Sequence, residues 1–296
     1  MSDYHISVLL KETIENLNIE PGKKYIDATL GGGGHSFEIL RHGGRVLGLD
    51  VDQDALDYVQ KELRIKNQEL RFDEKNLTLA KGNFRDIDKI ASKTGFAKVA
   101  GAVFDLGVSS HQLQIAERGF SFQREGPLDM RMDRDLSVKA GDLINILTRG
   151  ELYELFTKLG EEYNAHAISE RIIRARRVSP ILTTSELVEV VGDGRHNFKI
   201  NPATKVFQAL RIAINDEINS LKAGLSSMWG LTEKGGRLTV ISFHSLEDRI
   251  VKNQFKDWEK EGTGKIITKK PIIPSLDEVS VNKRSRSSKL RVIEKL

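Results

Sequence analysis

The first hundred residues alternate between strand-like and helix-like apolar patterns. Short apolar runs typical of buried strands cover residues 24–30, 45–50 and 99–106, while the stretch 54–66 carries its apolar residues near helical spacing. Strands that alternate with helical segments favour a parallel sheet joined by crossover helices. The pattern therefore predicts an α/β fold built on a doubly wound parallel sheet.

The pattern changes about a third of the way along the chain. Residues 113–204 contain several helical windows and no convincing strand. The α/β pattern then resumes, and the extended runs 265–273 and 289–294 are expected to pair as a closing hairpin of the same sheet. We therefore predict a discontinuous α/β domain of residues 1–112 and 205–296, interrupted by an all-helical domain of residues 113–204.

Composition narrows the class of protein. The chain has 296 residues, of which 39% are hydrophobic and 30% charged, which is typical of a globular protein with a buried core. The absence of cysteine excludes disulfides, iron–sulfur clusters and thiolate zinc sites. No uncharged apolar run reaches the ~18 residues of a membrane span. Asp3, Lys11 and Glu12 stand where a signal peptide would be apolar, so we expect a cytoplasmic protein without a membrane partner.

Four glycines follow the first predicted strand and precede a helix. Such a turn lets backbone N–H groups and the helix N-terminus approach a ligand closely. The dinucleotide pattern is incomplete, because Ser36 stands where Gly31-x-Gly33 would need a third glycine. Asp27 before the turn matches instead the S-adenosylmethionine pattern, in which a strand-end carboxylate meets the ammonium group of the cofactor. The alternative for the glycines alone is a flexible surface turn.

Three further residues lie at or just after predicted strand ends, where ligands of such sheets bind. Asp50 ends the second strand and is a candidate acceptor for ribose hydroxyls in either cofactor class. Phe84 follows a third apolar run at residues 77–80, where its ring is placed either on adenine or in the core. Asp105 ends the fourth strand and faces the same pocket, with a capping role as the alternative.

Six strings along the chain carry a resemblance to a known family. They cover residues 27–36, 104–110, 118–122, 126–133, 207–212 and 242–249. Together they closely resemble the bacterial ribosomal RNA small subunit methyltransferase H (MraW) family over nearly the whole chain. The resemblance implies a class I, Rossmann-like S-adenosylmethionine-dependent methyltransferase with an inserted helical domain. It also implies methylation of the N4 exocyclic amine of a cytidine in 16S rRNA, near the decoding centre of the small ribosomal subunit.

The resemblance also assigns cofactor contacts. Carried over position by position, they fall on Gly33, Gly34, His35, Asp50, Phe84, Asp105 and Gln112. The chain departs from the family at three places: Ser7 stands where the family usually has Pro, Gln114 where it has Asp, and Lys283 where it has Pro. The departure at Gln114 leaves open whether a carboxylate is needed there.

The implied reaction needs a hydrogen-bond acceptor beside the target amine, because the lone pair of the cytosine N4 is delocalised into the ring. Asp105 and the backbone carbonyl groups of residues 106–108 are the candidate acceptors, with Asp105 as the candidate catalytic residue. The reaction requires no metal. Phe120 and Phe122 are candidates to support a base flipped out of its stack, or they pack in the interior.

Clustered positive charge is the expected mark of an RNA-binding surface. Arg171, Arg174 and Arg177 share one face of a predicted helix in the inserted domain, which we expect to recognise the substrate. Arg284 and Arg286 lie in a basic tail. We expect these arginines to contact phosphates of the 16S rRNA, the alternative being a solvated surface.

Two other functions stay open on the residues alone. A nicotinamide-dependent dehydrogenase would use the same sheet, but Asp27 and Ser36 argue against it. A non-catalytic RNA-binding factor for ribosome assembly remains an alternative because of Gln114. The sequence does not decide between a monomer and a homodimer.

Overall fold

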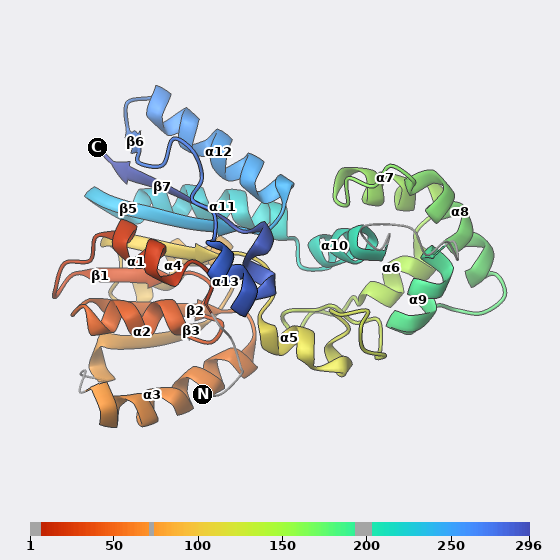
Figure 1. Cartoon of the computed structure of the whole chain (residues 1–296), viewed down its shortest axis with the longest axis horizontal. Helices are drawn as coiled ribbons and strands as arrows, with labels where there is room; N and C mark the ends of the chain where they lie inside the picture. Colours follow the sequence, from red (N-terminus) through yellow and green to blue (C-terminus); the bar gives the residue numbers. More distant parts are fainter. Residues whose placement is uncertain (1–6, 71–73, 193–202) are drawn as a thin grey trace. The chain divides into compact units, whose positions relative to one another are not determined.

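The computed structural model describes residues 7–70, 74–192 and 203–296 and divides into two compact units (Figure 1). The sheet unit consists of Met1–Ser109 and Ile218–Leu296, and the helical unit of Ser110–Glu217. Residue Asp3, one of those behind the expectation about a signal peptide, lies outside the described residues. Within the described residues, no helix combines the length and the apolar character needed to cross a membrane.

The sheet unit contains seven strands in the order β3-β2-β1-β4-β5-β7-β6. Their bounds are β1 Lys24–Asp27, β2 Arg45–Asp50, β3 Leu77–Lys81, β4 Val99–Asp105, β5 Thr232–Ser242, β6 Gly264–Ile266 and β7 Lys289–Lys295. Strands β1 to β5 pair in parallel, and β7 runs antiparallel to both β5 and β6. The predicted α/β fold class is confirmed, and the predicted closing hairpin exists as the β6–β7 pair.

Helices cover both faces of this sheet (Figure 1). Their bounds are α1 Leu10–Leu17, α2 Gly34–Arg41, α3 Gln53–Leu70, α4 Ile87–Lys93, α11 Glu217–Leu231, α12 Ser245–Lys260 and α13 Leu276–Val281. Side chains of α4, α11 and α12, such as Leu225 and Phe255, form one core, while α1, α2 and α3 supply the other, for example with Phe37 and Val59. The strands are apolar on both sides for this reason, which is typical of parallel sheets.

The helical unit contains α5 Ser110–Gln114, α6 Ala140–Ile146, α7 Arg149–Lys158, α8 Ala165–Arg176, α9 Thr184–Val191 and α10 Ala203–Ile214. It runs to Glu217, past the predicted end at residue 204, because α10 packs against α6, α7 and α9. Helix α9 begins with a capping box formed by Thr183 and Glu186.

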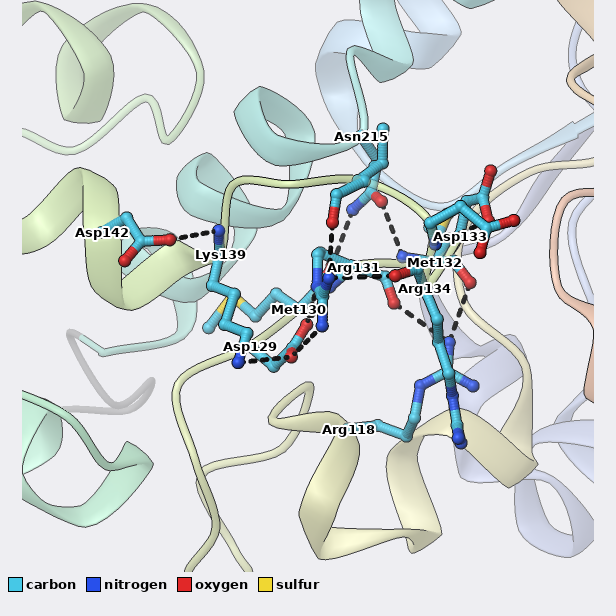
Figure 2. Close-up of polar contacts among 12 residues, drawn as sticks. Arg118, Asp129, Met130, Arg131, Met132, Asp133, Arg134, Lys139, Asp142 and Asn215 are labelled. Carbon is cyan, nitrogen blue, oxygen red and sulfur yellow. Dashed lines mark hydrogen bonds and ion pairs between the residues drawn. The ribbon is translucent and has the colours of Figure 1, made fainter.

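An ion pair between Arg131 and Asp129 stabilises the segment that joins Arg118 to α6 in this unit (Figure 2). The guanidinium of Arg131 donates to both carboxylate oxygens of Asp129, with Nε–Oδ1 and Nη2–Oδ2 distances of 2.7 and 2.8 Å. Burial alone would raise the pKa of Asp129, but the hydrogen bonds and charge of Arg131 lower it overall. The stabilisation is therefore present above the unfolded-state pKa of this carboxyl group and is lost as the pH falls below it.

Further polar contacts fix the backbone on either side of this pair (Figure 2). The Nη2 atom of Arg118 donates to the carbonyl groups of Arg131 and Met132, at 3.0 and 2.9 Å. The side chain of Asn215 donates to the Met130 carbonyl at 2.8 Å and accepts the Met132 N–H at 2.7 Å. These contacts hold Met130 in the left-handed region, with a φ of 61°.

Replacing Asp129 with alanine is expected to lower the free energy of unfolding by about 2–3 kcal/mol, because the half-buried guanidinium of Arg131 loses its carboxylate partner. Urea unfolding at neutral pH measures this change. The matched control is Glu154→Ala, which removes an exposed ion pair with Lys158 on α7 and should change stability by no more than about 0.5 kcal/mol. Equal effects of the two substitutions would contradict the role given to Asp129.

Candidate functional site

The four glycines form an ordered turn between β1 and α2. Gly33 caps α2 with a φ of 75°, and its N–H donates to the carbonyl of Leu30 at 2.7 Å. A Cβ atom at Gly33 would lie 2.9 Å from Val59 and 3.0 Å from Phe37, both of which are buried beneath the turn. Glycine is thus favoured at position 33 by the backbone conformation and by packing against the core.

A hydrogen bond joins this turn to the end of β2. The Oδ2 atom of Asp50 accepts the N–H of Gly31, and its Oδ1 atom accepts the N–H of Asp52, both at 2.9 Å. The backbone carbonyl of Asp50 accepts the N–H of Gly82 and so fixes the segment after β3. Burial raises the pKa of Asp50 to about 6, although the two N–H donors favour the charged form.

A second hydrogen bond joins the turn to the end of β4. The hydroxyl oxygen of Thr29 accepts the backbone N–H of Asp105 at 2.6 Å. Sequence analysis does not find this contact, because the two residues are far apart in the chain and only the fold brings them together. Both neighbouring strands of β1 are therefore tied to the same turn.

The turn also brings His35 beside Asp105. Its Nδ1 atom lies 3.9 Å from Oδ2 of Asp105, and both side chains are almost completely buried. The other ring nitrogen, Nε2, is buried and has no hydrogen-bond partner among the described residues. A buried polar atom without a partner costs free energy, so this nitrogen is suited to contact a ligand.

Asp27 lies beneath the turn with 1% of its surface exposed. Its carboxylate accepts the hydroxyl of Ser36 at 2.7 Å and the N–H of Thr29 at 3.3 Å. Burial raises the pKa of Asp27, and the charge of His35 and the hydrogen bond from Ser36 oppose that rise. The carboxylate is engaged in holding the turn on α2.

Phe84 begins the short 3-10 helix Phe84–Asp86 after β3. Its ring meets Phe104 edge to face at 5.7 Å, and a Cβ atom added at Gly224 would lie 2.7 Å from it. The side chain is only partly buried, so it packs against the core and keeps a part of its surface open. This geometry agrees with both roles that the sequence left open.

Three aromatic or polar candidates belong to the helical unit. Gln112 lies in α5 and is buried. Phe120 is buried, with the guanidinium of Arg118 5.7 Å from its ring centre, and Phe122 meets Phe207 edge to face at 5.3 Å. The contacts of Phe120 and Phe122 are those of packing residues.

The predicted arginine face on α8 is mixed in character. Arg174 and Arg177 are exposed, and Arg174 lies 3.7 Å from the carboxylate of Glu170. Arg171 is partly buried, and its Nε atom has no hydrogen-bond partner among the described residues.

The basic tail is used largely within the chain. Arg284, in the 3-10 helix Lys283–Ser287, donates to the carbonyl of Val108 in the segment after β4. Arg291 on β7 donates to Asp248 at 2.6 Å, while Arg286 is exposed. Sequence reasoning missed the contact with Val108, because a run of basic residues does not reveal which backbone groups a fold brings near it.

A cavity of about 500 Å³ lies at the amino ends of three inner strands, where β1, β4 and β5 begin. Its lining includes Lys23, Lys24, Lys98 and Glu233. None of the strand-end acids described above lines it. It is therefore separate from the candidate site, which lies at the carboxyl ends of the strands.

Comparisons with known proteins identify the family of the chain. The family model described as the MraW methylase family matches residues 2–296. A ribosomal RNA small subunit methyltransferase H from Carboxydothermus hydrogenoformans is 44% identical over 99% of this chain and 98% of its own length. A protein of the same name from Brevibacillus brevis is 41% identical over 100% and 99% of the two chains.

One solved structure with low sequence identity also matches over nearly the whole chain. The crystal structure of an rRNA methylase from Streptococcus thermophilus is 12% identical, covers 97% of this chain and 93% of its own, and gives a TM-score of 0.42. Because the family model spans almost the entire sequence and the curated relatives align from end to end, the chain belongs to the MraW methylase family.

Proposed function

We propose that this protein methylates rRNA of the small ribosomal subunit with S-adenosylmethionine as the methyl donor, at the N4 exocyclic amine of a cytidine in 16S rRNA near the decoding centre. Membership of the MraW methylase family supports the reaction class. The observation that carries the proposal is the single turn bonded to Asp50 on one side and to Asp105 on the other. The cytidine and its place follow from the resemblance of the sequence motifs.

The residues at the carboxyl ends of the strands fit S-adenosylmethionine. Asp50 is suited to accept the ribose hydroxyls, because each of its oxygens has a lone pair left beyond the N–H bond that it accepts. The partly open ring of Phe84 is suited to adenine, and the unpartnered Nε2 of His35 is suited to a polar group of the cofactor. Bound there, the cofactor supplies a methyl group activated by its sulfonium.

The remaining cofactor assignments, at Gly33, Gly34, Gln112 and Asp27, each rest on a different ground. Gly33 lets the backbone turn at the site, and a Cβ atom at Gly34 would collide with the side chain of Ser7. Gln112 is assigned from the helical unit by the resemblance. Asp27 was expected to meet the ammonium group of the cofactor. Its carboxylate already accepts two hydrogen bonds within the turn and is almost fully buried, so we give it a positioning role there.

Methyl transfer to the cytosine amine forms an N–C bond, breaks the S–C bond and releases one proton from the nitrogen. We assign the acceptor role to Asp105, whose carboxylate lies at the end of β4 beside His35. The carbonyl groups of Leu106 and Gly107 are further candidate acceptors. The carbonyl of Val108 is already bonded to Arg284, which makes Arg284 a residue that fixes this segment.

For contacts with RNA phosphates we retain the arginines that the sequence indicated. Arg174, Arg177 and Arg286 are exposed and are the better placed among them. Arg171 and Arg284 are partly buried, so they contribute less surface to an anion from outside.

Replacing Asp50 with alanine is expected to weaken binding of S-adenosylmethionine about 10- to 150-fold at neutral pH, because a buried charged acceptor is lost. In the unmodified protein, affinity should fall about tenfold between pH 7 and pH 5, since hydroxyl donors favour the charged carboxylate and its pKa is about 6. The affinity is thus retained above this pKa and lost as the pH falls through it. Calorimetric titration at several pH values measures both effects.

The matched control for this substitution is Asp57→Ala, which removes an exposed carboxylate on α3 that contacts only Gln53 in the described structure. It should leave both the affinity and its pH dependence unchanged. An Asp50→Ala protein that binds the cofactor as tightly as the unmodified protein would remove Asp50 from the site.

The reaction itself is tested by incubating the protein with small ribosomal subunits and S-adenosylmethionine labelled in its methyl group. We expect the label in 16S rRNA, at the N4 of a cytidine when the digested RNA is analysed by mass spectrometry. Subunits bound without transfer of label would support a non-catalytic assembly factor instead. Label on another base or atom would refute the assignment of the target while leaving the methyltransferase reaction in place.

A further inference from the structure

Tyr163 in the helical unit is more exposed than any other aromatic side chain that the structure describes. It lies in the connection between α7 and α8, and 95% of its surface is open to solvent. Aromatic side chains normally bury a large apolar area, so an exposed ring forgoes stabilisation that folding would otherwise gain. The ring of Tyr163 is therefore available to a binding partner.

The ring of Tyr163 makes a cation–π contact with Lys205. The Nζ atom of Lys205, on α10, lies 4.7 Å from the ring centre of Tyr163. The same atom donates to the carbonyl of Glu161 at 2.7 Å and lies 4.0 Å from the carboxylate of Glu162. The ammonium group is therefore fixed, and its cation–π contact leaves the opposite face of the ring to solvent.

The backbone beneath the ring is also fixed. The N–H groups of Gly160 and Glu162 both donate to the carbonyl of Phe156, each at 3.1 Å. Glu162 is 8% exposed and accepts the N–H of Asn164 at 2.8 Å. Tyr163 thus projects from a turn that is bonded on both sides, which reduces the entropy that a bound partner would have to remove.

Two further aromatic rings lie on α7 and α8, the helices that flank Tyr163. Tyr153 of α7 and His166 of α8 meet edge to face with ring centres 6.3 Å apart, and both are exposed. Only two residues separate His166 from Tyr163. Exposed aromatic rings therefore lie on both α7 and α8 as well as in the segment that connects them.

The surroundings of Tyr163 indicate what kind of partner would use it. Among the described residues, its neighbours along the chain and its contact Lys205 are polar or charged, namely Glu161, Asn164, His166 and Lys205, which suits a polar partner better than an apolar protein surface. Acidic and basic residues nearly balance between residues 110 and 217, so broad electrostatic attraction does not explain binding here. An oriented ring with one free face suits an unpaired base, whose own face is open, whereas bases in a duplex are covered by their neighbours.

We propose that Tyr163, oriented by Lys205, stacks on an unpaired base of the RNA substrate. This inference rests on the proposed function and adds the form of RNA that the helical unit recognises, a single-stranded segment. Stacking does not read the identity of a base, so the contact adds affinity for unpaired RNA irrespective of sequence.

The test compares Tyr163→Ala and Tyr163→Phe with the unmodified protein, using fluorescence anisotropy and a short labelled oligoribonucleotide, either single-stranded or annealed to its complement. Tyr163→Ala should weaken binding of the single strand about 5- to 150-fold, and Tyr163→Phe by no more than about twofold, because the ring face is retained. Duplex binding and the dependence of affinity on salt should not change, because no phosphate contact is removed. Leu276→Ala, an exposed apolar residue of the sheet unit, is the matched control and should have no effect.

Two results would overturn the stacking contact: equal affinity of the Tyr163→Ala and unmodified proteins for the single strand, or equal losses in the alanine and phenylalanine variants. The methyl-transfer assay on small subunits separates this inference from the proposed function. A protein that transfers methyl groups but binds the single strand equally well with alanine at position 163 refutes only the stacking. A protein that neither transfers methyl groups nor binds RNA refutes both.

Discussion

The candidate site depends on one constraint: the turn after β1 has to satisfy the buried polar groups at the ends of the strands on either side of β1. Gly31 donates to the carboxylate of Asp50, and Thr29 accepts the N–H of Asp105. Buried polar groups without partners are costly, so these bonds fix the turn and both strand ends together. Beside this turn, the buried Nε2 atom of His35 has no hydrogen-bond partner among the described residues and is suited to contact a ligand.

The chain uses much of its positive charge to stabilise its own backbone and carboxylates. Arg118 and Arg131 organise the segment before α6, Arg291 pairs with Asp248, and Arg284 holds the segment after β4. Guanidinium groups suit this use because several donors in one plane satisfy neighbouring acceptors at once. An exposed aromatic ring is consequently a better pointer to an RNA contact in the helical unit than the number of its basic residues.

The sequence was sufficient to predict the elements whose signals are local. The alternation of strands and helices predicted the parallel sheet, and the glycines between Asp27 and Ser36 predicted the turn. Contacts between distant segments left no such signal. The packing of α10 into the helical unit and the bond from Arg284 to Val108 depend on tertiary structure alone. The core beneath Gly33 likewise involves Val59, whose place next to the turn is set by the fold.

Hydrogen–deuterium exchange with and without S-adenosylmethionine measures whether the turn after β1 and the neighbouring strand ends hold the cofactor. If they do, we expect slower exchange in peptides covering residues 28–36, 50–52 and 82–84 when the cofactor is added. We expect no change at residues 22–24 and 95–100, which line the cavity at the amino ends of the strands or lie next to it. Slower exchange at the amino ends of the strands, together with unchanged exchange in the turn, would contradict the assignment of the cofactor site to the turn.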